Sequence, residues 1–206
     1  MDAAELFAKG GFVMYLLSAC SVAVAAIGIE RFRFYRHATR DAENFLSALN
    51  ERLRTQHAGE LLSFCRAENS CVGLVTLAGV KASVAGENVE LALNIAYDEE
   101  AMRLRARLKY LSTIVTLAPL LGLLGTISGM IDSFNIFSLQ AGQPLAITGG
   151  IGEALIATAA GLCVAIFALI VHTYFAQKLD ESLTTLDKAV NIVLARLGGR
   201  HEKAAT

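Results

Sequence analysis

A long run without basic residues sets the strongest limit on what this chain can fold into. From Tyr110 to Gln177 there is no lysine or arginine, and the side chains there that can carry charge are Asp132, Glu153 and His172. A charged side chain at the centre of a bilayer costs roughly 3 kcal/mol or more, so such runs are typical of membrane-spanning segments. The two acids within this run therefore need a reason to be there.

The composition points to the same class of protein. Hydrophobic residues make up 54% of the 206 residues and charged residues 18%, and the mean hydropathy is +0.50. These values lie outside the soluble average and within the membrane class. Of the 18 basic residues, 12 lie between Arg31 and Lys109, interleaved with acids and beside apolar segments. We therefore expect these residues to lie beside a lipid bilayer and not to bind nucleic acid.

Hydropathy predicts three membrane-spanning helices, over residues 11–29, 110–137 and 145–175. At about 1.5 Å of rise per residue, each can cross a hydrocarbon core of about 30 Å. The segment before the first span is net acidic, and no small-residue cleavage site is followed by an exported domain. The first span is therefore expected to be a retained anchor and not a signal peptide.

Basic residues predict the orientation, because they favour the cytoplasmic side of a membrane. Four arginines follow the first span, and three arginines and a lysine precede the second. The expected order is residues 1–10 outside, 30–109 inside, 138–144 outside as a turn, and 176–206 inside. The N-terminus is then periplasmic and the C-terminus cytoplasmic.

The inside segments are expected to be helical and to form a bundle beneath the membrane. Residues 30–109 contain no proline, and the candidate interruptions are at 57–59, 68–70 and 86–88. Strong helix formers continue from Val89 to Lys109 directly into the second span. This continuity predicts one long helix that projects from the membrane into the cytosol.

The tail contains apolar residues spaced 4, 3, 4, 3 and 4 apart, which is the spacing of a heptad seam. The seam consists of Leu179, Leu183, Leu186, Val190, Val193 and Leu197. Gly198 and Gly199 are expected to end the helix. Two partners for the seam remain open: the protein's own cytosolic helices, or copies of the chain around a symmetry axis.

The second span contains a ridge of small residues at helical spacing: Ala118, Gly122, Gly125, Gly129 and Asp132. Small residues allow close helix contact in lipid, within or between subunits. Asp132 lies close to the outer end, where a solvated acid is the commoner case and a proton carrier the alternative. Pro119 removes one helical hydrogen bond, which predicts a bend or a loosened turn near Thr116.

The third span contains Glu153, and no basic residue in any span can neutralise it. Desolvation favours its protonated form unless water reaches it. A proton-responsive site and a pore-lining acid both fit, and the alternative is a neutral glutamic acid that locks subunits together. The hydroxyls of Thr126 and Thr158 are expected either to line a polar lumen or to bond to helix carbonyls. Gly161 continues the small residues of this span.

No pattern in the sequence indicates an enzyme. There is no nucleophile–base pair, phosphate-binding loop or metal-ligand spacing, so we expect no catalytic residue, metal or cofactor. The four cysteines are expected to be reduced, packed thiols.

Two long blocks, Leu111–Phe134 and Ile147–Phe175, strongly resemble the MotA/TolQ/ExbB proton-channel family. The resemblance is greatest to the short ExbB/TolQ branch, and the ERFRFY sequence of Glu30–Tyr35 resembles the end of that branch's first helix. The three spans, the orientation and the inside loop are consistent with this branch over nearly the whole chain. Phe167 departs from the family, which usually has a proline there and a bend.

The resemblance implies an all-α polytopic protein of the bacterial cytoplasmic membrane that assembles with copies of itself, in the family as a pentamer. The oligomer would surround a dimer of a single-span ExbD/TolR-like partner, whose membrane aspartate is the main ion carrier in the family. On the matching positions, Thr126, Glu153 and Thr158 would form the polar lining. Proton flow would energise a TonB- or TolA-like protein for outer-membrane transport or envelope maintenance.

Two other functions remain open from the sequence. The chain is a passive scaffold if its helices merely assemble or anchor a partner. It is a self-sufficient ion channel if it conducts without a partner.

Overall fold

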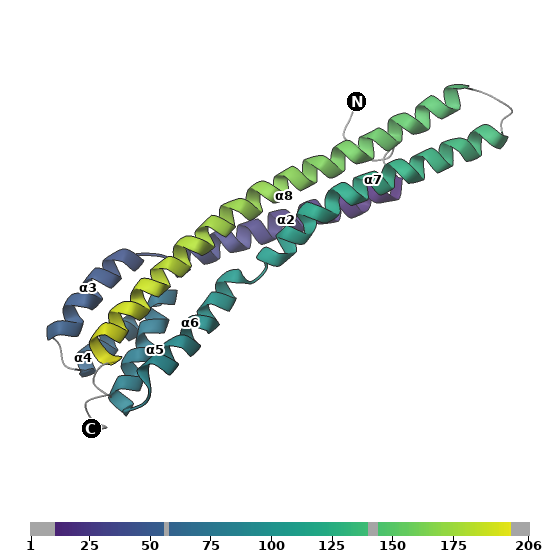
Figure 1. The fold of residues 1–206 in the computed structure, drawn as a ribbon. Coiled ribbons are helices and arrows are strands. Elements are labelled where there is room, and N and C mark those ends of the chain that lie inside the picture. The colour runs from purple at the N-terminus through teal and green to yellow at the C-terminus, as the bar shows by residue number, and fades with distance from the viewer. Residues whose placement is uncertain (1–10, 56–57, 140–143, 199–206) are drawn as a thin grey trace. The chain divides into compact units, whose positions relative to one another are not determined.

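The computed structural model describes residues 11–55, 58–139 and 144–198, with the side chains of residues 58, 136–139, 144–149 and 153 left outside the description. Every element in the described residues is helical (Figure 1). The elements are α2 (Gly11–Ala38), α3 (Ala42–Thr55), α4 (Ala58–Ala67), α5 (Cys71–Ala85), α6 (Val89–Arg105), α7 (Leu108–Leu139), α8 (Pro144–Val193) and a π-helical turn, η1 (Leu194–Gly198). The predicted all-α class is confirmed.

Three helices are long and apolar enough to cross a membrane. Their apolar segments lie in α2, α7 and α8, at the three places where hydropathy predicts spans. Pro144 begins α8, a position where the missing proline N–H costs nothing because the first helical N–H groups have no helical partner. α8 continues as a helix through Phe167, and α7 continues as a helix through Pro119.

The chain divides into two compact units. Unit 1 contains residues 1–30 and 107–174, and unit 2 contains residues 31–106 and 175–206. These boundaries fall within a few residues of the predicted ends of the apolar spans. Unit 1 therefore holds the three apolar segments that are long enough to cross a membrane, and unit 2 holds the shorter helices α3 to α6 and the end of α8.

The predicted interruptions at 68–70 and 86–88 are confirmed, and each has a local cause. The Ser70 hydroxyl accepts a hydrogen bond from a first-turn N–H of α5, and the Asn88 side-chain oxygen does the same for α6. Gly86 ends α5 with a left-handed φ of 74°, which glycine adopts without steric cost. The interruption predicted at 57–59 lies partly outside the described residues.

The prediction of one helix from Val89 through Lys109 is wrong. α6 ends at Arg105 and α7 begins at Leu108, with Arg107 between them at a left-handed φ of 67°. Local propensity favours continuing the helix, but side chains of α2 bind the last carbonyls of α6. Tertiary contacts therefore override propensity at this point. A second break, at Asp41 between α2 and α3, has a φ of 55° and was not predicted.

The tail packs on its own chain along a stripe that shares Leu186, Val193 and Leu197 with the predicted seam but not its other three residues. Leu179, Leu183 and Val190 are only half-buried. The buried stripe consists of Phe175, Ser182, Leu186, Ala189, Val193 and Leu197. Val193 packs against Gly79 of α5, where an added Cβ would lie 3.0 Å from Val193 Cγ1. Packing of the seam residues against copies of the chain stays a prediction.

α5 forms the core of unit 2, between α4 and α6. Val72, Val75 and Val80 of α5 are almost completely buried, and the Thr76 hydroxyl is satisfied by carbonyls of its own helix. On α3 and α4, the rings of Phe45 and Phe64 stack with centroids 5.0 Å apart. This helical core buries the carboxyl group of Glu100, a residue that is 7% exposed.

Glu100 gives unit 2 a testable pH dependence. Burial raises the pKa of the Glu100 carboxyl, and the ion pair with Arg103 at 2.9 Å opposes this only in part. A raised pKa means that the stabilising contribution is complete below the ordinary pKa near 4.5 and is lost as the pH rises through the raised value. We therefore expect Glu100→Gln to raise the melting temperature of the detergent-solubilised protein at pH 7.5, with a smaller gain at pH 4.5.

The matched control is Glu99→Gln, because Glu99 also pairs with Arg103 but its side chain is 61% exposed. This variant should show no such pH-dependent gain. Equal gains from both substitutions at pH 7.5 would contradict the burial argument.

Candidate functional site

In unit 1, α7 and α8 run side by side (Figure 1) and touch through small residues. A Cβ added at Gly161 would lie 2.7 Å from the Ala118 carbonyl oxygen and 3.0 Å from Gly122 Cα. A Cβ added at Gly125 would lie 2.5 Å from Ala157 Cβ. Real Cβ atoms do not approach other atoms this closely, so glycine is required for this helix contact. Close contact of this kind replaces the hydrophobic driving force that lipid does not supply.

The same contact continues toward the outer ends of the two helices. A Cβ at Gly129 would lie 3.0 Å from Ala154 Cβ, and a Cβ at Gly150 would overlap the Ser133 hydroxyl. Ser133 is buried, and its Oγ donates to the Gly129 carbonyl at 2.6 Å. The helix thereby satisfies a buried hydroxyl with its own backbone.

The first apolar helix completes the packing of unit 1. Val13, Leu17 and Val24 of α2 are buried at spacings of four and seven residues, which is one face of a helix. Val13 lies near Gly125, and Val171 of α8 lies near Gly28 of α2. α2, α7 and α8 therefore share one apolar core within unit 1.

Thr158 makes a hydrogen bond between the two long helices. Its Oγ1 on α8 donates to the carbonyl oxygen of Gly122 on α7 at 3.0 Å. This carbonyl is accessible because Gly122 has no side chain to cover it. Interhelical hydrogen bonds in membranes contribute about 0.6 kcal/mol on average, so this bond orients the helices more than it stabilises them.

Thr126 uses its hydroxyl differently. Thr126 Oγ1 donates to the Leu123 carbonyl of its own helix at 2.6 Å, and the residue is half-buried. The sequence left two roles open for these hydroxyls, lining a lumen or bonding to helix carbonyls. In the structure, the hydroxyls of Thr126 and Thr158 both donate to backbone carbonyls. A hydroxyl that donates in this way can still accept a hydrogen bond, so lining a lumen stays a prediction for both residues.

Two acids were predicted for the site. Glu153 lies in α8, one residue before Ala154, but its side chain lies outside the described residues. Asp132 is exposed on α7, one residue before the buried Ser133. Their roles in ion movement stay predictions.

The sequence analysis identified the ridge on α7 but missed its partner on α8. Gly150, Ala154, Ala157 and Gly161 are spaced 4, 3 and 4 apart, the same pattern as the ridge on α7. This second run of small residues is visible in the sequence. Two matching ridges on adjacent spans predict the α7–α8 contact.

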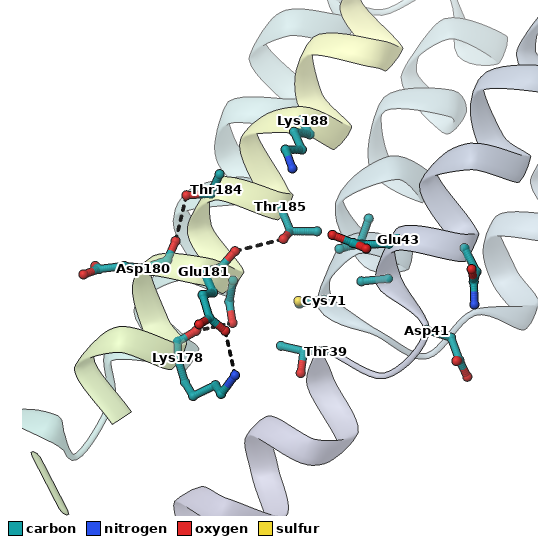
Figure 2. A pocket seen from close by; sticks show the side chains of 14 residues that line it. Thr39, Asp41, Glu43, Cys71, Lys178, Asp180, Glu181, Thr184, Thr185 and Lys188 are labelled. Atoms are coloured by element: carbon teal, nitrogen blue, oxygen red, sulfur yellow. Dashed lines mark hydrogen bonds and ion pairs between the residues drawn. The ribbon is translucent and has the colours of Figure 1, made fainter. Parts of the chain in front are cut away.

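Unit 2 contains a cavity of about 770 Å³ at the start of α3, the start of α5 and one face of α8 (Figure 2). Its charged groups have both signs, and Lys178 pairs with Glu181 at 2.7 Å. Burial raises the pKa of the Cys71 thiol in its wall to about 11, so this thiol stays protonated at neutral pH. In the described part of the chain, no group of three or more His, Cys, Asp or Glu side chains can hold a metal ion. The cavity therefore does not provide a reactive thiol or a metal site.

An all-helical chain with three apolar helices and glycine-mediated contacts between them is a polytopic membrane protein. Residues 67–188 match the family model described as the MotA/TolQ/ExbB proton channel family. This match covers more than half of the chain. The chain belongs to the MotA/TolQ/ExbB proton channel family.

Relatives agree with this assignment. An ExbB-like biopolymer transport protein of Synechocystis sp. is 36% identical over 175 residues, covering 80% of this chain and 67% of that protein. An ExbB homologue of Methanothermobacter thermautotrophicus is 28% identical over 89% of this chain and 66% of its own length. The Tol-Pal system protein TolQ of Haemophilus influenzae is 29% identical over 85% of both chains.

The matches span about two thirds of the length of the first two relatives. Family membership and the three apolar helices together identify an inner-membrane protein of a transport and channel family. This family consists of transport proteins and is not known for enzymes.

Because α7 and α8 pack closely at Gly161, a larger side chain at this position should destabilise the protein. Gly161→Val places a branched side chain against the Ala118 carbonyl and the Gly122 backbone. Overpacking costs about 1–3 kcal/mol, so the melting temperature in detergent should fall by several degrees. The control is Gly152→Val in the same helix, where an added Cβ meets nothing within 4 Å. Equal losses from both variants would contradict close α7–α8 packing.

Proposed function

We propose that this chain is the channel-forming subunit of an inner-membrane complex driven by the proton-motive force. The observation that carries the proposal is the family match over residues 67–188, which includes all of α7 and most of α8. The α7–α8 contact and the Thr158–Gly122 hydrogen bond lie within this match. The proposed polar path lies along these two helices.

Glu153 is the proposed ion-responsive group, with Thr126 and Thr158 as polar lining. Support comes from the sequence: Glu153 lies in an apolar helix, and none of the three predicted spans contains a lysine or arginine that could pair with it. Intramembrane carboxyl groups of this kind are functional by default. One elementary charge that crosses 100 mV releases about 2.3 kcal/mol, so a few protons can shift a conformational equilibrium decisively.

The proposed complex contains several copies of this chain, a pentamer as expected from the family, around an ExbD/TolR-like single-span protein. The apolar helices of this chain contain few ionisable groups and no evident complete relay. A carboxyl group from the partner would complete the path. A TonB- or TolA-like protein is the proposed recipient of the energy, in outer-membrane transport or envelope maintenance.

The proposed topology follows the distribution of basic residues. Residues 1–10 and 138–144 lie on the periplasmic side, and residues 30–109 and 176–206 lie on the cytoplasmic side as a helical bundle. Unit 2 would then form the cytoplasmic part of each subunit.

Proton flux into liposomes tests the proposed function. Liposomes contain a pH-sensitive dye and either this chain alone or this chain with an ExbD/TolR-like protein, and a potassium diffusion potential drives proton entry. We expect flux only with both proteins, and at least a tenfold lower flux with Glu153→Gln, because an amide cannot bind and release the proton.

Each other result has a defined meaning. Flux with this chain alone supports a partner-independent channel. No flux in either preparation, with correct assembly verified by native mass spectrometry, supports a passive scaffold. A proton flux in Glu153→Gln equal to that of the parent protein would show that Glu153 is not part of the ion path.

The Thr158 hydroxyl provides a second test. Thr158→Val keeps the branched shape but removes the donor to the Gly122 carbonyl. Partner-dependent flux should fall severalfold, while oligomers still form. Thr158→Ser keeps the donor and should retain most of the flux. Equal flux in the two variants would show that the hydroxyl has no role in the path.

A further inference from the structure

Two helix faces of unit 2 are apolar and uncovered by the rest of the unit. Apart from Phe32, the large hydrophobic residues that are exposed in the described part of unit 2 lie on α5 and α6. Their exposed fractions run from 40% to 67%, and they are Leu74, Val84, Leu91, Ile95 and Met102. Apolar residues that gather on one exposed face, in contrast to single scattered ones, mark an interaction surface.

The face on α5 combines apolar residues with a lysine. Spacings of three, four and three residues place them on one side of the helix, and we call them the α5 stripe: Leu74, Leu77, Lys81 and Val84. The stripe borders a cavity of about 630 Å³ between α4 and α5, which Arg66 of α4 also lines. Arg66 and Lys81 are exposed, and neither forms an ion pair with another described residue. The α5 stripe is therefore apolar and positively charged.

The face on α6 combines apolar residues with an acid. Spacings of four, three and four residues place them on one side of the helix, and we call them the α6 stripe: Leu91, Ile95, Asp98 and Met102. Asp98 is exposed and forms no ion pair with another residue in the described ranges. Within the chain, α6 packs on α5 through other residues, such as Leu93 against Gly79. The α6 stripe therefore takes no part in the packing of its own unit.

The two stripes are complementary in charge and in spacing. Lys81 has apolar residues four positions before it and three positions after it, and Asp98 has them three positions before it and four positions after it. These spacings mirror each other when the two helices run antiparallel. With Lys81 opposite Asp98, Leu77 then lies opposite Met102. In the same register, Val84 lies opposite Ile95.

A second copy of the chain accounts for both stripes at once. A contact between the α5 stripe of one copy and the α6 stripe of another joins two different surfaces, and such head-to-tail contacts close into rings when the rotation allows it. Every copy in a ring uses both of its stripes, so neither apolar face stays exposed. An anionic lipid surface would pair with Lys81 but not with Asp98. One bound peptide would cover a single stripe.

We propose that the α5 stripe and the α6 stripe are the two halves of an interface between copies of this chain, in which Lys81 of one copy pairs with Asp98 of the next. This inference rests on the proposed assembly of several copies, and it names surfaces that join them. Opposite charges at the centre of the contact fix its register, and the apolar residues on either side exclude water.

Disulfide cross-linking in the membrane tests this interface. Two full-length copies with different tags are produced together with the ExbD/TolR-like partner, and copper phenanthroline is added as the oxidant. One copy carries Lys81→Cys, and the other carries Asp98→Cys. The control replaces Asp98→Cys with Glu99→Cys, because Glu99 is the next residue of α6 and its side chain is 61% exposed. Adjacent helical residues point about 100° apart, so position 99 lies off the α6 stripe.

The native thiols are kept out of the reaction. Both copies carry Cys20→Ala and Cys163→Ala, whereas Cys65 and Cys71 are retained because they are buried. We expect at least fivefold more of the dimer that contains both tags from the pair of positions 81 and 98 than from the pair of positions 81 and 99. Lys81→Cys in both copies should give no more dimer than the control, because a head-to-tail contact does not bring equal positions together.

A second measurement identifies what covers the α5 stripe. A photo-reactive benzophenone amino acid takes the place of Val84, which is 54% exposed. An adduct with a second copy of the chain supports the proposal. Adducts with the ExbD/TolR-like partner alone, or with lipid alone, would overturn it.

The cross-linking result can also contradict the proposal directly. Equal dimer yields with Asp98→Cys and Glu99→Cys, or a dominant dimer between two Lys81→Cys copies, would do so. The proposed function is tested separately by proton flux. Partner-dependent flux without a cross-link between positions 81 and 98 overturns this inference alone, and a cross-link without any flux overturns the proposed function alone.

Discussion

The contact between α7 and α8 is the constraint on which the rest of the membrane unit depends. Lipid does not drive apolar helices together, so their association requires close packing and internally satisfied polar groups. Glycines at 122, 125, 129, 150 and 161 allow this approach. The Thr158 hydroxyl then reaches the Gly122 carbonyl across the interface. The proposed ion path includes this contact, which places the Thr158 hydroxyl of α8 against α7.

Much of this fold can be predicted from sequence, because its causes are local. Uninterrupted apolar runs predict the three long helices, because all residues of a span lie at the depth of the hydrocarbon core and their backbone groups must be hydrogen-bonded within the helix. Ser70, Asn88 and Gly86 mark helix ends through their own side-chain or backbone chemistry. The glycine ridge of α7 is also visible, because small residues at a spacing of three and four have a known use in lipid.

Other features depend on residues far apart in the chain and could not be predicted in this way. The last carbonyls of α6 are bound by Arg31 and Tyr35, about 70 residues earlier, so local helix propensity gave the wrong result for the end of α6. The tail packs along a stripe that includes Phe175, because Tyr35 stacks there, and a heptad spacing does not reveal its partner. The Thr158 hydroxyl could bond to its own helix or across an interface, and only the position of Gly122 decides between these. The role of Glu153 remains a prediction from its position in an apolar helix.

Infrared difference spectroscopy of the complex in liposomes tests the central claim most directly, because it detects protonation of individual carboxyl groups. Isotope-labelled copies of this chain are combined with an unlabelled ExbD/TolR-like partner, and the external pH is lowered. We predict a protonated-carboxyl band from the labelled chain that changes with pH and is absent in Glu153→Gln. Identical spectra from the parent protein and Glu153→Gln would contradict the assignment of Glu153 as the ion-responsive group.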